Sequence, residues 1–442
     1  MRRYRLVAIG GMVVCSAAAA WLLADRHTRR SLQQVRQVVT EPAAQPPTRA
    51  FGPPPKMVAM GTGADGTRDR AVLKPTRELV FEDGKAPASI LFSAKRGVAY
   101  VACLGARVGE IDWTQLTQAE VIAVNAETGE SLARLPFEEL GAIALSSDER
   151  YLAVVSVQPK PPFNTTLNLY RTDDLSRKVT AMPLPRGVAC SVVRVDKGGT
   201  VYIANALGNL LHRVAKGGAQ TAELDRVQLS PLPWVEDPKL FPSVSLTPGD
   251  LCLGIDDRVL YVAAADLSQW QTDQSDGEPA ESGWAGILVV NPRTLKMIQS
   301  VPLEGSGLGL WRNERSLVCV HGDRVDTLPM ADDGHLLAPR KGPPSPRIFG
   351  GPLFIDETRS LGYVPAWAGA ARKSWVIQVL DLRAQRLVGS VPVEGQYWIN
   401  PEFGFSPATD EVWVGTWSQD HVFIYDLDEV IKRAHAEGET SL

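Results

Sequence analysis

The stretch Gln396–Leu427, QYWINPEFGFSPATDEVWVGTWSQDHVFIYDL, is the clearest copy of a unit that recurs along this chain. Three short segments within it are rich in Val, Phe, Trp and Tyr, namely Glu402–Phe405, Val412–Gly415 and Val422–Tyr425. Pro, Gly, Asp and Ser bound these segments, as they commonly bound β-strands. The stretch therefore predicts antiparallel strands joined by tight turns.

The second strand of this unit is its most regular element, and it recurs through the whole chain. Successive copies are separated by about 45 to 60 residues, which is the period of one propeller blade. The seven copies are Val98–Ala102, Tyr151–Val155, Val201–Ala204, Leu260–Ala263, Leu317–Val320, Leu361–Val364 and Val412–Gly415.

The pattern predicts an all-β, seven-bladed β-propeller over residues 72–428. Helical periodicity is almost absent apart from Asp428–Ala436, which excludes a parallel α/β sheet. The last unit has only three strands before this helical segment, and residues 429–442 are left as a C-terminal tail. The isolated strand Arg77–Glu82 would supply the missing outer strand, so that the ring closes without an open edge.

The repeat also resembles a known group of propellers. The resemblance rests on Val98–Ala102 (VAYVA), Leu260–Ala263 (LYVA) and Pro401–Val414, and it extends from about Arg77 to Asp428. These segments are similar to the YVTN-type repeat, found in the superfamily that includes the cytochrome d1 domain and the heavy chains of quinoprotein amine dehydrogenases. The resemblance implies the fold. Because the group contains enzymes, cofactor binders and plain scaffolds, it assigns no catalytic residue.

The N-terminus predicts a membrane attachment. Leu6–Ala24 is apolar and uncharged, and about 19 such residues can span a bilayer as a helix. We interpret residues 1–24 as a signal anchor; a cleaved signal peptide is the alternative, since Ala17–Ala20 supplies small residues. Residues 25–71 form a juxtamembrane segment and a Pro-rich tether. The body would then be extracytoplasmic, and periplasmic in a bacterium.

Composition and cysteine usage exclude some classes of function. A net charge of -4 and the lack of a basic block predict no nucleic-acid partner. The absence of C-x-x-C argues against a zinc knuckle and against c-type haem attachment. We expect buried free thiols, with one or two disulfides as the alternative, at Cys103, Cys190, Cys252 and Cys319.

The connections between strands differ on the two faces of the disc. In a four-stranded antiparallel blade, the loop between strands two and three shares a face with the crossover to the next blade. We call this the loop face and the opposite one the turn face. Connections on the turn face are short and charged, for example Ser146–Arg150 (SSDER). The long connections fall on the loop face, at Leu104–Gln118, Gln158–Thr165, Ser230–Ser243, Asp266–Ala285 and Pro365–Ser374.

Tryptophan is concentrated in these long connections, which predicts a binding face because Trp supplies a large rigid contact area. Two histidines, at the end of a second strand and at the start of a third, point to the same face. The candidate binding residues are Trp113, Trp234, Trp270, Trp284, His321, Trp367, Trp398, Trp417 and His421. In the alternative, the loops fold over the disc and Trp forms a small satellite core, most plausibly at Trp284 and Trp375.

The sequence contains no metal-binding, P-loop, Rossmann or nucleophile-elbow motif, so it predicts no metal and names no catalytic residue. We expect a membrane-tethered binding or scaffold protein without a cofactor. Its Trp-rich face would bind a protein, a glycan or a small molecule. One alternative is a redox-associated propeller, such as a dehydrogenase subunit or a haem d1-type or quinone-type cofactor-binding protein. Another is a propeller lactonase or related hydrolase.

Overall fold

The computed structural model describes the greater part of the predicted propeller. The described residues are 54–59, 72–81, 85–107, 119–138, 140–157, 164–184, 192–205, 209–215, 218–224, 246–265, 285–303, 307–313, 315–321, 324–343, 353–367, 375–393, 402–406, 408–415 and 420–440. The apolar run Leu6–Ala24 and most of the predicted tether lie outside them. None of the helices in the described part has the length and apolar character that a membrane span requires.

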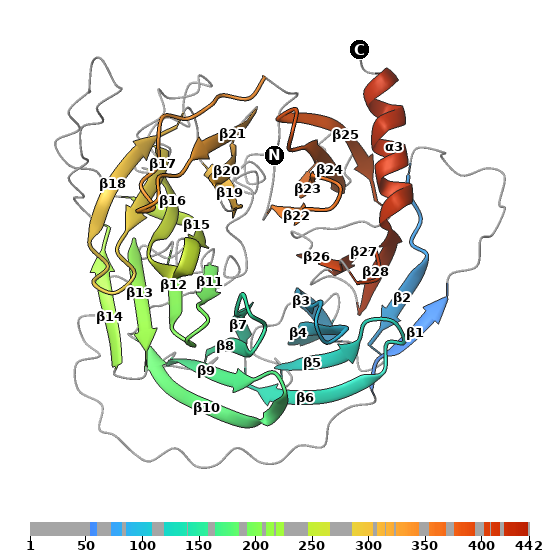
Figure 1. The fold of residues 1–442 in the computed structure, drawn as a ribbon. Helices are drawn as coiled ribbons and strands as arrows, with labels where there is room; N and C mark the ends of the chain where they lie inside the picture. Colours follow the sequence, from blue (N-terminus) through green and yellow to red (C-terminus); the bar gives the residue numbers. More distant parts are fainter. Residues whose placement is uncertain are drawn as a thin grey trace, which may run out of the picture.

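Seven antiparallel sheets are arranged around a ring, which confirms an all-β, seven-bladed propeller (Figure 1). Blade 1 contains β3 (Lys85–Ser93), β4 (Val98–Arg107), β5 (Ala119–Asn125) and β6 (Ser131–Phe137). Blade 2 contains β7 (Leu140–Leu145), β8 (Tyr151–Val157), β9 (Thr165–Arg171) and β10 (Asp174–Leu184). Blade 3 contains β11 (Val192–Val195), β12 (Val201–Asn205), β13 (Leu210–Ala215) and β14 (Gly218–Glu223).

The remaining blades continue round the ring to its seam. Blade 4 contains β15 (Thr247–Leu253), β16 (Leu260–Ala265), β17 (Ala285–Val290) and β18 (Met297–Pro302). Blade 5 contains β19 (Gly307–Arg312), β20 (Ser316–His321) and β21 (Arg324–Pro329). Blade 6 contains β22 (Phe354–Asp356), β23 (Leu361–Trp367), β24 (Trp375–Asp381) and β25 (Arg386–Pro392). Blade 7 contains β26 (Glu402–Ser406), β27 (Glu411–Gly415), β28 (His421–Asp426), β2 (Arg77–Val80) and β1 (Lys56–Ala59).

The seam of the ring joins the two ends of the chain. β2 pairs antiparallel with β28, with Arg77 opposite Ile424 and Val80 opposite His421. This is the pairing that the sequence predicts for the segment Arg77–Glu82. β2 is not the outermost strand, however. β1 pairs with it from outside, and its residues fall within the predicted tether.

Blade 5 has an irregular outer edge in place of a fourth strand. The backbones of Thr327 and Arg340 exchange hydrogen bonds of 3.1 and 2.8 Å, so the segment after β21 turns back along it. Leu336, in that segment, is completely buried.

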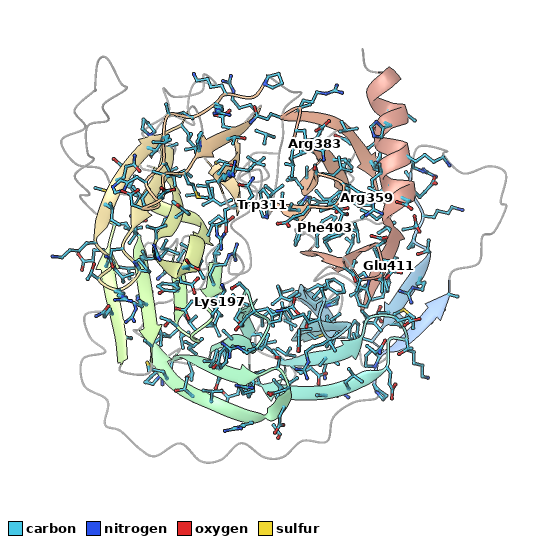
Figure 2. All side chains as sticks on the ribbon, viewed as in Figure 1. Lys197, Trp311, Arg359, Arg383, Phe403 and Glu411 are labelled. Carbon is cyan, nitrogen blue, oxygen red and sulfur yellow. The ribbon has the colours of Figure 1, made fainter. Side chains whose placement is uncertain are left out.

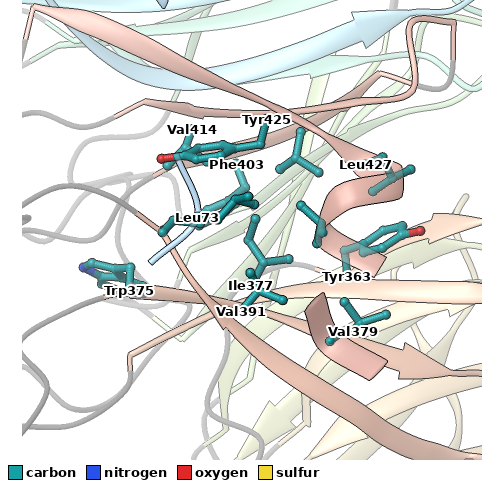
Figure 3. Packing of buried hydrophobic residues seen from close by; sticks show 14 of the residues in the cluster. Leu73, Tyr363, Trp375, Ile377, Val379, Val391, Phe403, Val414, Tyr425 and Leu427 are labelled. Atoms are coloured by element: carbon teal, nitrogen blue, oxygen red, sulfur yellow. The ribbon is translucent and has the colours of Figure 1, made fainter. Parts of the chain in front are cut away.

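The core lies between the blades. Each blade packs against a neighbouring blade on each of its two faces. Strands such as β16 and β17 are therefore buried along their whole length and are apolar on both faces. Figure 3 shows the cluster between blades 6 and 7, where Tyr363, Ile377 and Phe403 pack together with Leu73. Cys319 is buried and free, Cys252 is half-buried and free, and Cys103 is buried; Cys190 lies outside the described residues.

The chain ends in a helix, α3 (Leu427–Thr440), that covers the outer part of blade 6 (Figure 1). Its residues Val430 and Ala434 are completely buried. A Cβ at Gly389 of β25 would collide with the carbonyl oxygen of Ala434, and one at Gly438 would collide with that of Val388. Glycine at both positions therefore allows the helix and strand backbones to touch. The predicted C-terminal tail, as far as Thr440, is therefore part of the folded body.

Candidate functional site

Short polar side chains close the connections on the turn face. The Asn125 Oδ1 atom accepts the backbone N–H groups of Glu127 and Thr128, both at 2.9 Å. Such side chains imitate a backbone turn and so favour short connections. The residues that accept backbone N–H groups in this way are Asn125, Asp148, Asp196, Asn291, Asn313, Asp356 and Asp381.

Side-chain bonds also join neighbouring blades across the turn face. Arg359 binds Asp356 in its own turn at 2.8 Å, Asp410 of blade 7 at 3.0 Å and Asp428 of α3 at 3.1 Å (Figure 2). Burial alone would raise the pKa of Asp356, but its bonds to Thr358 and Arg359 hold that pKa below the ordinary value. The Asp410 and Asp356 carboxylates in turn raise the pKa of Arg359. The polar groups of these turns are thus engaged with one another.

The loop face is built where second strands end and third strands begin. Two strands extend further toward it than the sequence predicts, because Leu104–Arg107 continues β4 and Pro365–Trp367 continues β23. Trp367 is therefore the last residue of a strand and lies opposite Trp375. Trp375 is buried in the core between blades 6 and 7, which agrees with a structural role.

The two candidate histidines lie at the same face. His321 is the last residue of β20 and pairs with Gly307 and Arg324 in the neighbouring strands. His421 is the first residue of β28, and its Nδ1 atom lies 3.1 Å from the Asp420 Oδ1 atom. The His421 ring packs edge-on against Phe423, with 4.6 Å between the ring centroids, and its side chain is 23% exposed.

The structure thus places three predicted residues, His321, Trp367 and His421, at the loop-face ends of three consecutive blades, blades 5, 6 and 7. Among the residues that the structure describes, no group of three or more His, Cys, Asp or Glu side chains could hold a metal ion. The remaining candidates lie outside the described residues, namely Trp113, Trp234, Trp270, Trp284, Trp398 and Trp417.

A buried charged cluster in blade 1 is absent from the sequence prediction. Glu120, at the loop-face end of β5, is 1% exposed and binds the side chain of Lys85. Arg134 donates to both Glu120 oxygens, from Nε at 2.7 Å and from Nη2 at 2.5 Å. Glu120 is the only charged residue in the strand Ala119–Asn125. This isolated charge is the feature of the sequence that could have identified the cluster.

A second missed residue, Asp250, joins the inner strands of three blades. Its Oδ1 atom accepts hydrogen bonds from Arg194 Nη2 of β11 at 2.7 Å and from the Leu251 N–H at 2.8 Å. Its Oδ2 atom accepts the Leu310 N–H of β19 at 2.9 Å. Burial raises the pKa of Asp250, against the opposing effect of Arg194 and the two N–H groups. No periodicity in the sequence singles out this aspartate.

The fold defines the class of the protein as a seven-bladed β-propeller. No protein-family model matches the chain, and no curated protein matches it. A chain in a solved structure titled "Crystal Structure of Mitotic Checkpoint Complex" is similar, with a TM-score of 0.51 and 12% identity over 89% of this chain and 99% of that one. A chain titled "Crystal structure of RRP9 WD40 repeats" gives a TM-score of 0.45 and 13% identity over 77% and 94%.

Proposed function

We propose that this protein is an extracytoplasmic, membrane-tethered scaffold that binds a protein partner through its loop face. The observation that carries the proposal is the difference between the two faces. In the described part of the turn face, connections are short and their polar groups bind one another. The sequence predicts that the long, Trp-rich connections belong to the opposite face. A binding surface needs side chains that are not already committed within the fold.

A protein suits this face better than a small molecule. His321, Trp367 and His421 stand on three consecutive blades, so a ligand that contacts them all must be broad. Protein interfaces typically bury about 800 Å² on each partner, which matches a surface spread over several blades. The similar solved chain comes from a structure titled as a protein complex, which agrees with this choice.

The direction of β1 supports the tethered arrangement. Lys56 lies opposite Val80, and Val80 lies opposite His421 at the loop-face end of β28. The chain that precedes Lys56 therefore joins the body at its loop-face end. With Leu6–Ala24 as the membrane anchor, this end of the body is the one nearer to the anchor. A partner in the same membrane would then meet the loop face.

Site-specific photocrosslinking in the native membrane tests the proposal. A photoreactive amino acid replaces His321, Trp367 or His421 on the loop face, one position at a time. Matched controls place it at Thr128, Arg293 or Arg315, which are exposed on the turn face of blades 1, 4 and 5. We expect adducts to a discrete protein from the loop-face positions alone. Equal adducts from both faces, or none from the loop face, would overturn the proposal.

The absorption spectrum and metal content of the purified full chain separate this proposal from the redox and hydrolase alternatives. A plain scaffold is colourless and free of stoichiometric metal. A visible absorption band would favour the haem or quinone-type alternative. A bound metal in stoichiometric amount would favour the hydrolase. Either result would replace the scaffold proposal.

A further inference from the structure

The N-terminal part of the body contacts three consecutive blades. Its first anchor is Leu73, which is 4% exposed and belongs to the core between blades 6 and 7 (Figure 3). The Leu73 N–H donates to the Pro392 carbonyl of blade 6 at 2.8 Å, and Leu73 forms a parallel bridge with Val393. Leu73 thus ties the segment just before β2 to blade 6.

The second anchor is the pairing with blade 7. The Thr76 N–H and Oγ1 both donate to the Ile424 carbonyl, at 2.7 and 3.0 Å. At the other end of β2, the Phe81 N–H donates to the Asp420 carbonyl at 2.7 Å. Leu79 and Phe81 are almost completely buried. This pairing is the strand addition that closes the ring.

The third anchor reaches blade 1. Arg77 donates to the Glu127 carbonyl in the turn between β5 and β6 at 2.5 Å. The Met57 side chain of β1 covers Gly129 in the same turn, because a Cβ at Gly129 would lie 2.7 Å from the Met57 Cβ and 3.4 Å from Leu79 Cδ1. Gly129 has a φ of +73°, which also disfavours a side chain there. β1 therefore lies across the junction between blades 7 and 1.

This junction differs from the others in its covalent connectivity. The chain runs from the outer strand of one blade into the inner strand of the next, for example from β6 to β7. At the seam the chain runs from β2 into β3, so no covalent crossover joins β26, β27 and β28 to blade 1. They are held to it by the pairing of β2 with β28 and by side-chain packing, for example of Trp413 against Phe92. That pairing comprises four residue pairs. The seam is the place where the ring can open without a covalent crossover to stretch.

We propose that residues 54–59 and 72–81 act as a strap that locks the seam, and that the contacts of Leu73 and Met57, outside the β2–β28 pairing, limit how often the ring opens. Leu73 holds the strap to blade 6 and Met57 holds it to blade 1, so β2 cannot leave β28 unless both contacts break. The inference follows from these contacts alone and does not depend on the proposed partner or on membrane attachment.

Native-state hydrogen exchange on the full chain in detergent tests the strap. The variants are Leu73→Ala and Met57→Ala. The control Val58→Ala changes the neighbouring, 44% exposed residue of β1. The control Leu211→Ala removes a completely buried leucine from the core between blades 3 and 4. We expect amide exchange in β2 and β28 to rise about tenfold or more in both strap variants, with exchange in blades 3 and 4 unchanged.

Two outcomes would overturn the proposal. One is unchanged exchange in β28 when exchange in β1 alone rises, because the strap would then not hold the seam. The other is an equal rise in β28 in Leu211→Ala, because the effect would then be a general loss of stability. If Leu73→Ala does not fold, the milder Leu73→Val takes its place, since it removes less of the same buried side chain.

Discussion

Arg77 of β2 and Glu411 of β27 meet at the seam of the ring, although they lie 334 positions apart in the chain. The Arg77 Nη2 atom lies 2.5 Å from Glu411 Oε1 and 2.7 Å from Oε2. Glu411 also accepts hydrogen bonds from Thr409 and from the Trp413 indole at 2.8 and 3.2 Å. The pair thus connects β2, the strand that closes the ring, to β27 of the last blade.

Replacing Glu411 with Gln should lower the free energy of unfolding by about 2 kcal/mol, because Arg77 then keeps a partly buried charge with a weaker acceptor. Urea denaturation of the full chain measures the change. Glu130→Gln, an exposed glutamate in the turn after β5, is the control and should shift the midpoint very little. A double-mutant cycle with Arg77→Ala isolates the pair, and a coupling energy near zero would contradict this account.

The Glu120 cluster predicts a larger effect. In Glu120→Ala, Lys85 and Arg134 lose the carboxylate that both of them bind, while both remain largely buried. Removing one partner from a buried ion pair typically costs about 3 to 5 kcal/mol. Equilibrium unfolding in urea tests this expectation, with Glu127→Ala, an exposed glutamate on the turn face, as control. A loss below about 1 kcal/mol would show that water reaches the cluster freely.

Two buried tyrosines should respond differently to the loss of their hydroxyl groups. The Tyr261 hydroxyl donates to the Gly334 carbonyl at 2.9 Å, whereas the Tyr363 hydroxyl has no hydrogen-bond partner among the described residues. Burial raises the pKa of both groups. Tyr261→Phe should therefore lose about 1 kcal/mol of stability, and Tyr363→Phe should be neutral or stabilising. Thermal and urea unfolding of the two variants side by side provide the comparison; equal losses would refute it.

His212 predicts a pH dependence of stability. It is completely buried, with Nδ1 2.8 Å from Thr221 Oγ1, and burial lowers its pKa below the ordinary value of 6.5. The folded protein therefore binds this proton less readily than the unfolded chain does. The His212 contribution is complete above about pH 6.5 and is lost as the pH falls toward and through the lowered pKa.

Unfolding free energies measured in urea between pH 8 and pH 5 test this dependence. In His212→Gln the fall in stability over that range should be smaller than in the native protein. Identical slopes for the native chain and His212→Gln would show that His212 does not carry the effect.

The strand positions could be predicted because the signals are local. Short runs of Val, Ile and aromatic residues between Gly, Asp and Pro recur at a fixed period, and all seven predicted second strands coincide with strands of the structure. The strand β1 was missed because Lys56–Ala59 is only four residues long and follows three prolines. Its pairing depends on β2, which the local sequence cannot reveal.

The candidate site was predictable only in part. The assignment of connections to two faces follows from strand order, and the structure places His321 and His421 at the expected ends of their strands. The extension of β23 to Trp367 was not predicted, because the residues Pro365–Trp367 are compatible with either a loop or a strand. Their pairing with β24 is what makes them part of the strand.

By itself, the sequence determined the number of blades and their order, and it predicts the face on which the long connections lie. These properties follow from periodicity and from the alternation of connections in an antiparallel blade. Only the tertiary structure decided which residues close the ring, how Leu73 and Met57 reach neighbouring blades, and why Glu120 and Asp250 are buried. Those contacts join residues far apart in the chain, so their energies depend on a geometry that exists only once the ring has closed.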